Sequence, residues 1–214
     1  MTQGQWARFT GRSPSNYGPS SKVNGHQHDL THPVEQVTWT QCMEVMSRLG
    51  LELPSEAQWE SGCRGGQDTP WWTGAERESL RGNVNLADQT AAKAGASWAD
   101  IKDWPELEDG WVVHAPVGSL AANPFGLHEV HGNVWEWCRD GYADYSADEQ
   151  HDPVTPWSGA QARVSRGGSF SDAASDARSA YRDDYAPESQ YHTLGLRPAR
   201  ASQLPTSLPH KTGK

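Results

Sequence analysis

The sequence is short of apolar residues and contains no long run of them. Hydrophobic residues make up 35% of the 214 residues, and no stretch approaches the ~20 apolar residues that a membrane-spanning helix needs. We therefore expect no membrane insertion. Lysine and arginine are also scarce, at 18 against 27 acidic residues, and they form no cluster. A net charge of −9 without a basic patch argues against nucleic-acid binding.

Cysteine is equally scarce. The three cysteines, Cys42, Cys63 and Cys138, are odd in number and widely spaced. They therefore predict neither a disulfide framework nor a Cys-x-x-Cys metal pair. The first residues do not have the pattern of a signal peptide. We expect a cytoplasmic location for the chain as given, with secretion from a longer precursor as the alternative.

Glycine, proline and tryptophan are what the sequence has in quantity, with 21, 14 and 11 residues. This mixture favours a loop-rich fold whose core is built from a few large aromatic side chains. The length suits one domain, which we place at residues 1–200. Residues 201–214 are rich in Ser, Pro, Thr and Lys without periodic apolar residues, and we expect them to form a mobile tail.

Three segments carry helix signals. Residues 2–10 and 40–49 place apolar side chains at three- and four-residue spacing, which predicts two amphipathic helices. Ser55 and Gln58 have the spacing of a capping box, so a third helix is predicted to begin directly after Ser55. The span 91–104 could hold one further short helix.

The densest part of the chain runs from Asn123 to Cys138 and reads Asn-Pro-Phe-Gly-Leu-His-Glu-Val-His-Gly-Asn-Val-Trp-Glu-Trp-Cys. On a strand, Trp135 and Trp137 face one side and Glu136 faces the other. A buried carboxylate needs a compensating charge or several hydrogen-bond donors. This segment is therefore a candidate ion site inside a core.

Two later motifs, Arg163-Val-Ser-Arg-Gly-Gly-Ser-Phe170 and Gly195-Leu-Arg197, accompany Gly-Asn-Val-Trp-Glu-Trp. Together they resemble the formylglycine-generating enzyme family, also called the sulfatase-modifying-factor domain, over roughly residues 1–200. The segment Leu-Pro-Ser-Glu-Ala-Gln-Trp-Glu, which starts at Leu53, is similar to a helix of that family. The resemblance implies an α+β, C-type-lectin-like fold, with two or three helices around small twisted antiparallel sheets and many loops.

The resemblance also implies two structural calcium sites. Calcium takes ~6–8 oxygen ligands, and loops supply carbonyl oxygens that are not used in ladders. The first set comprises Asn85, the Leu86 carbonyl, Asp109 and the Trp111 carbonyl. The second set comprises Glu129, the Gly132 and Val134 carbonyls, and Glu136. The alternatives are that Glu136 pairs with a buried arginine, such as Arg166 or Arg197, and that Asp109 only caps a turn.

The catalytic copper site of the family is where this sequence departs from the pattern. Active members bind Cu(I) through two cysteines after the Arg-Gly-Gly-Ser motif, and soft thiolates are the ligands that Cu(I) selects. Here the matching positions are Asp172 and Ala177, and no cysteine follows Cys138. We therefore expect neither copper binding nor formylglycine generation.

The segment after Arg-Gly-Gly-Ser is rich in Tyr, Ser and Asp, which adaptable binding surfaces favour. Trp135 and Ser169 match groove residues of the active family. We expect a non-catalytic domain that binds a protein, a peptide or a small molecule. The candidate ligand-binding residues are Trp135, Ser169, Asp172, Asp176, Tyr181, Asp184, Tyr185, Tyr191 and His192.

Two other interpretations stay open. The residue types in 171–194 are those that randomised Asn codons yield, as in the variable protein of a diversity-generating retroelement. Alternatively, the chain is an enzyme of the same family with non-copper chemistry, such as oxidative maturation of a peptide or metabolite. Asp172, Asp176 and His192 would then be its acid and base groups, although ordinary surface polarity also explains them.

A polar loop at residues 11–30 contains His26 and His28. Two histidines on such a loop are more often solvated than bound to a metal ion. We therefore interpret both as solvated side chains.

Overall fold

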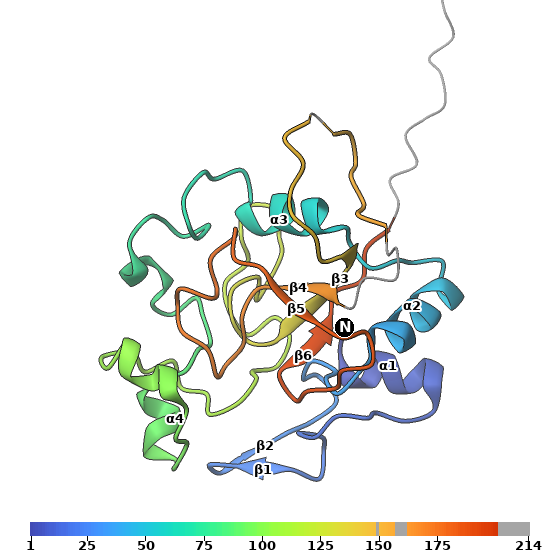
Figure 1. Cartoon of the computed structure of the whole chain (residues 1–214). Helices are drawn as coiled ribbons and strands as arrows, with labels where there is room; N and C mark the ends of the chain where they lie inside the picture. Colours follow the sequence, from blue (N-terminus) through green and yellow to red (C-terminus); the bar gives the residue numbers. More distant parts are fainter. Residues whose placement is uncertain (149, 157–161, 201–214) are drawn as a thin grey trace, which may run out of the picture.

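The computed structural model describes residues 1–148, 150–156 and 162–200, and its architecture is α+β, as predicted (Figure 1). The predicted tail at 201–214 lies outside the described residues. A central sheet has the strand order β5-β4-β3-β6, and a two-stranded hairpin, β1-β2, lies apart from it. The strands are β1 (Lys22–Val23), β2 (His26–Gln27), β3 (Trp135–Gly141), β4 (Arg163–Arg166), β5 (Asp183–Tyr185) and β6 (Leu194–Leu196).

One strand pairing differs from the predicted antiparallel sheets. β3 pairs antiparallel with β4, and β4 with β5, but β6 runs parallel to β3. The chain between β5 and β6 passes from one edge of the sheet to the other, so β6 points the same way as β5 and β3. Glu136, the second residue of β3, is thereby opposite both Arg166 and Gly195.

Three helices begin at capping boxes. In α1 (Gln3–Thr10), α2 (Trp39–Arg48) and α3 (Glu56–Arg64), the N-cap side chain accepts a bond from the N3 amide and a glutamine at N3 bonds back. The box predicted at Ser55 is confirmed. The span predicted to hold one short helix contains the end of α4 (Gln89–Lys93) and a 3-10 turn, η2 (Ala99–Asp103); another, η1 (Arg77–Leu80), precedes it.

β3 lies between two apolar clusters. Trp135 and Trp137 pack into a core formed with α1, α2 and β6, and the Trp137 indole donates to the Val37 carbonyl over 3.0 Å. Glu136 points to the opposite side, where Trp59 of α3 donates to its carboxylate over 2.7 Å. The predicted alternation along this strand is confirmed.

Two glycines beside β3 are required by backbone packing. A Cβ on Gly132, whose φ is +72°, would lie 2.1 Å from the Asn85 carbonyl oxygen. A Cβ on Gly195 would lie 2.5 Å from the Val34 carbonyl oxygen. No side chain fits at such distances, so these glycines allow two distant loops to pack against the central strand.

All three cysteines are buried and unpaired. Among the described residues, no helix has the length and apolar character that crossing a membrane would require.

Candidate functional site

Asp172 lies at one of the positions that the resemblance matches to a copper-binding cysteine. Its Oδ2 atom accepts three hydrogen bonds: one from Trp135 Nε1 at 2.9 Å, one from the Ser169 amide at 2.9 Å and one from Ser169 Oγ at 2.5 Å. Burial raises the pKa of the Asp172 carboxyl above its ordinary value, although these bonds oppose the shift. The Asp172 carboxyl group is therefore fixed by hydrogen bonds between β3 and the loop after β4.

Two further carboxylates lie beside Asp172. Oxygen atoms of Asp100, Asp172 and Asp176 all lie within 4.8 Å of one another, and all three residues are half-buried. Burial raises the pKa of Asp176, and the neighbouring Asp100 adds to that rise. Sequence reasoning missed Asp100, which comes from η2 and carries no local signal. The ring of Tyr181 packs against Trp135 at 6.0 Å, so the acidic group has an aromatic border.

The other two candidate tyrosines, Tyr185 and Tyr191, lie beside Trp137, the second tryptophan of β3. Tyr185 meets Trp137 edge-on at 6.2 Å and Tyr191 at 5.2 Å. Tyr191 is 46% exposed. Asp184, next to Tyr185 on β5, is exposed on the other face of the sheet, where it pairs with Val164. Because Trp135 and Trp137 project from the same face of β3, the acidic group and the tyrosines follow one side of the strand.

His192 lies elsewhere. It packs against Tyr17 at 5.7 Å and Phe170 at 6.0 Å, between the polar N-terminal loop and the Arg-Gly-Gly-Ser-Phe motif. Seven of the nine candidate ligand-binding residues thus border the β3 face. Asp184 pairs with Val164 and faces the other side of the sheet, and His192 contacts the N-terminal loop.

The prediction that His28 is solvated is wrong. Its side chain is 3% exposed, and its ring lies 4.5 Å from that of His32 and 5.4 Å from that of His114. The loop folds back on itself, because the His28 amide donates to the Ser21 carbonyl and Tyr17 stacks on the His28 ring. His26 is exposed, as predicted.

The first predicted calcium set lies in buried loops. Asn85 is fully buried; its Nδ2 donates to the Val113 carbonyl at 3.1 Å and to Asn133 Oδ1 at 3.0 Å, whereas its Oδ1 has no partner. A buried amide oxygen without a donor is a position that a cation would satisfy.

Asp109, in the same set, lies close to a second carboxylate. Its oxygens accept the amides of Leu86 at 2.9 Å and Trp111 at 2.8 Å, and its own amide donates to Asp88 at 2.6 Å. Burial, followed by repulsion from Asp88, raises the pKa of Asp109 to about 8. Two close carboxylates, one buried and one half-buried, and an unpartnered amide oxygen fit a hard cation such as calcium. Asp88 was missed because its N-cap role in α4 carries no metal signal.

The second set has its charges compensated within the protein. Arg197 Nε and Nη2 each donate to the Glu136 carboxylate at 2.8 Å, which is the alternative that we set against a calcium ion. Glu129 accepts the amides of Gly118 and Leu120, both at 2.9 Å. Arg166, the other candidate partner, pairs with Glu60 instead.

Gly132 and Val134, whose carbonyls complete this set, both lie in buried backbone. The Gly132 amide donates to the Gly167 carbonyl at 2.7 Å, and the Val134 side chain is buried. Arg197 thus compensates the charge of Glu136 within the protein, and a calcium ion at the second set stays a prediction.

None of the three cysteines offers a thiolate. Burial raises the pKa of the Cys63 thiol to about 12 and that of the Cys42 and Cys138 thiols well above the ordinary value. Buried thiols of this kind are inert as nucleophiles and as metal ligands.

Comparison with known proteins identifies the family to which this fold and sequence are similar. The model of the sulfatase-modifying factor enzyme 1-like domain matches residues 1–202. The formylglycine-generating enzyme of Mus musculus is 33% identical over 198 residues, which cover 89% of this chain and 49% of that protein. The enzyme of Thermomonospora curvata is 36% identical over 160 residues, covering 72% and 48%. The chain spans about half the length of these relatives.

Other relatives and solved structures carry the same domain or fold. The serine/threonine-protein kinase pkn1 of Chlamydia caviae is 33% identical over 174 residues, covering 79% of this chain and 24% of that protein. Treponema denticola variable protein 1 superposes with a TM-score of 0.74 at 23% identity, covering 94% of this chain and 82% of that one. PvdO from Pseudomonas aeruginosa has a TM-score of 0.71 at 21% identity, covering 93% and 77%. The chain belongs to the sulfatase-modifying-factor domain family, the family of the formylglycine-generating enzymes.

Proposed function

We propose that this chain is a ligand-binding domain of its family and that it does not generate formylglycine. Its ligand would lie at the border of the buried Trp135–Trp137 core, where Tyr181 and Tyr185 are partly exposed. The observation that carries the proposal is the state of Asp172. A carboxyl group held by Trp135 and Ser169 takes a position where the resemblance expects a thiol, and Cu(I) selects soft thiolates over carboxylates.

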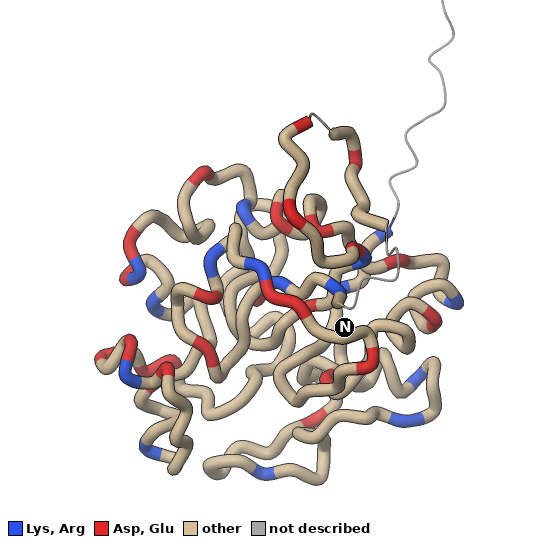
Figure 2. The backbone as a smooth tube through the Cα atoms, viewed as in Figure 1, with Lys and Arg blue, Asp and Glu red and all other residues tan. Residues whose placement is uncertain are grey.

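The chemistry of this face favours a ligand with a cationic group. Asp100, Asp172 and Asp176 gather their oxygens at one end, and Figure 2 shows acidic positions continuing along β5. The aromatic rings beside them add an attraction for ammonium or guanidinium groups. Arg182 in the same segment does not oppose this, because its guanidinium is bound to Glu56 at 2.6 and 2.8 Å. A peptide with lysine or arginine is the ligand class that fits best.

The same face would suit a variable binding surface. The fold is shared with a protein named as a treponeme variable protein, and here exposed Tyr191 packs on Tyr185, whose ring meets buried Trp137. We propose residues 171–193 as the part that varies. Sequencing the gene in independent isolates tests this: substitutions concentrated in 171–193 support it, and an even spread along the chain contradicts it.

We further propose that one calcium ion stabilises the loops that carry Asn85, Asp88 and Asp109. The unpartnered Asn85 Oδ1 and the pair of close carboxylates support it. A hard divalent cation there would balance the negative charges of the two neighbouring carboxylates.

Calorimetry with matched peptides tests the ligand proposal. A set of peptides of equal length, differing only in lysine or arginine against glutamate, is titrated into the full chain with calcium present. Tighter binding of the basic peptides, weakening with added salt, supports the proposal. Equal or tighter binding of the acidic peptides contradicts it.

A further inference from the structure

Three histidines from distant parts of the chain meet in the interior. His28 comes from the polar N-terminal loop, His32 from the segment that precedes the Pro-Val-Glu turn, and His114 from the stretch before the central motif. All are buried, at 3%, 4% and 0% exposure. One ring nitrogen of each lies within 4.8 Å of the others, and His32 Nδ1 is 3.1 Å from both His114 Nδ1 and the His114 carbonyl oxygen.

The hydrogen-bonding capacity of this cluster is not met by the protein. His28 Nδ1 and His114 Nε2 are buried without a hydrogen-bond partner. Buried polar nitrogens in native proteins are nearly always paired, so two in contact with the same group of rings call for an explanation. A metal ion bound to His28 would take up the lone pair of its ring nitrogen, and the second orphan, His114 Nε2, lies 3.7 Å from a carboxylate oxygen of Glu35.

A buried carboxylate stands directly behind the cluster. Glu35 is 0% exposed, and its Oε1 lies 3.7 Å from His114 Nε2, while its Oε2 has no partner. Oε1 also accepts the Tyr17 amide at 2.9 Å. Histidines that bind metals commonly direct their second ring nitrogen at a carboxylate, which fixes the tautomer and orients the ring. A metal ion on the far side of His114 would also balance the Glu35 charge.

We propose that His28, His32 and His114 bind a single zinc ion, with Glu35 orienting His114. Three imidazoles suit zinc, and a three-histidine set leaves a fourth tetrahedral position open for water or another ligand. Zinc–nitrogen bonds of about 2.0–2.1 Å place tetrahedral ligand atoms about 3.3 Å apart. The His32–His114 nitrogen separation is already close to this value, so only His28 needs to close in.

The protonation of the cluster agrees with this assignment. Burial, followed by the neighbouring histidines, lowers the pKa of His32 to about 4 and also lowers that of His28. Both imidazoles are therefore neutral near neutral pH, and zinc binds the neutral form.

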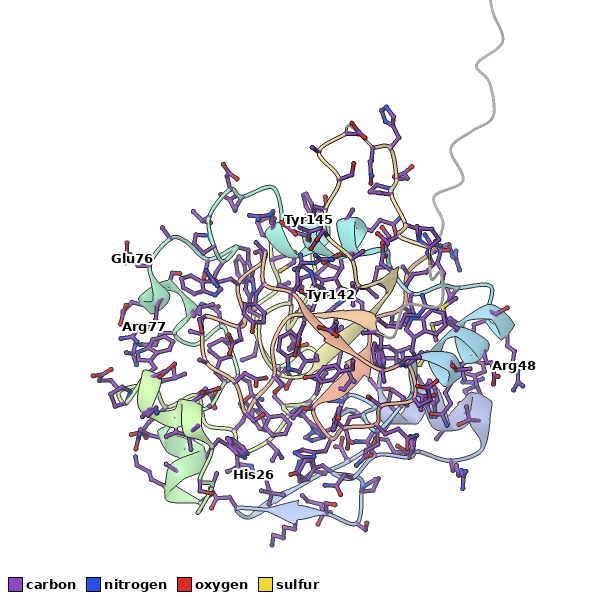
Figure 3. The ribbon with its side chains drawn as sticks, in the orientation of Figure 1. His26, Arg48, Glu76, Arg77, Tyr142 and Tyr145 are labelled. Carbon is purple, nitrogen blue, oxygen red and sulfur yellow. The ribbon has the colours of Figure 1, made fainter. Side chains whose placement is uncertain are left out.

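The site is separate from the calcium set and from the family's copper position. It contacts a pocket lined by Val23, Trp111 and Val113, with exposed His26 at its edge. Figure 3 labels His26 near the β1-β2 hairpin, away from the central sheet. Tyr17 stacks on His28 at 5.8 Å and meets His192 at 5.7 Å. Zinc would therefore hold the loop at 11–30 against the segment that carries His192.

The experiment uses the full chain, stripped of metals and then returned to calcium so that only the second metal is varied. Zinc is titrated against a chromophoric chelator, metal content is measured by elemental analysis, and cobalt is substituted for its visible spectrum. The variants are His28→Gln and Glu35→Gln, with His26→Gln as the exposed control. Proteolysis within the loop at 11–30 is followed with and without zinc.

The proposal predicts one zinc per chain, an intense tetrahedral cobalt spectrum and slower cleavage of the loop with zinc. Glu35→Gln should weaken zinc binding by about 10–100-fold, His28→Gln by more, and His26→Gln not at all. Wild-type protein that retains no stoichiometric zinc overturns the proposal, as does a loss of binding in His26→Gln equal to that in His28→Gln. If His28→Gln does not fold, the wild-type stoichiometry and cobalt spectrum decide the question, and an octahedral cobalt spectrum contradicts it.

Discussion

Trp135 Nε1 donates to Asp172 Oδ2 over 2.9 Å, and this bond joins the central strand to the loop after β4. The loop is therefore held through the residue that the resemblance matches to a thiol of the active family. The bond fixes one border of the proposed binding face, and a carboxylate there is not the soft ligand that Cu(I) selects.

Asp172→Asn should change how stability depends on pH. The folded chain holds the Asp172 proton more tightly than the unfolded chain, because burial raises the pKa of this carboxyl. The contribution of Asp172 to the free energy of unfolding therefore falls as pH rises from about 3.9, the ordinary value, through the folded pKa. Asparagine can still accept the bonds from Trp135 and Ser169 but does not ionise.

The measurement is urea unfolding of the wild type and Asp172→Asn over that pH range. The stability of the variant relative to wild type should increase with pH. A constant difference, or a difference of the opposite slope, would contradict the assigned cause of the shift.

The Glu136–Arg197 ion pair should be among the costliest to break. Truncating Arg197 to Ala leaves the buried Glu136 carboxylate without its partner, which costs about 3–5 kcal/mol. The exposed pair Lys93–Glu108, with side chains 62% and 58% exposed, is the matched control. Lys93→Ala should change the free energy of unfolding by less than about 1 kcal/mol. Denaturant melts that place the two variants at equal stability would refute the proposed role of the pair.

Chelation of calcium should lower the melting temperature. An ion that binds only the folded chain adds about 2.7 kcal/mol at a hundredfold excess over its Kd. Asp109→Asn should abolish the response, while Glu108→Gln, one residue earlier and exposed, should keep it. In chelator, Asp109→Asn should be no less stable than wild type, because the variant also removes the repulsion from Asp88. An unchanged melting curve after chelation, with no calcium by elemental analysis, would disprove the site.

The rim and the base of the binding face should respond differently to truncation. Trp137→Ala removes a fully buried indole and should cost about 3–5 kcal/mol. Tyr191→Ala at the rim, and Asp184→Ala on the other face of the sheet, change exposed side chains and should each shift stability by only about 0.5 kcal/mol. Thermal melts compare the variants; a large loss in either exposed variant would place that residue in the core.

The parts of the fold set by local patterns were accessible from sequence. The capping box at Ser55 involves residues three apart, and the alternation of Trp135, Glu136 and Trp137 involves neighbours. Both depend on the period of one element, so a single sequence reports them. The parallel course of β6 depends on how the chain crosses the sheet, which no local pattern records.

The chemistry of the sites depended on distant contacts. His28 and His114 are 86 positions apart by number, and only the folding of a polar loop onto its neighbours brings their rings to 5.4 Å. Asp100 likewise reaches Asp172 from a different segment. Residue type alone assigned His28 to solvent, because composition does not show which loop will be covered.

The central claim is that this face binds a basic peptide without converting it. The most direct test measures, in one sample, which peptides the protein retains and whether their mass has changed. The full chain with calcium is incubated under air with copper and a library of peptides that contain lysine, arginine and cysteine, beside the Tyr191→Ala variant. The account predicts that the wild type retains basic peptides and returns them at unchanged mass, while the variant folds normally and retains markedly less. A peptide that returns with altered mass, or equal retention by the variant, would contradict it.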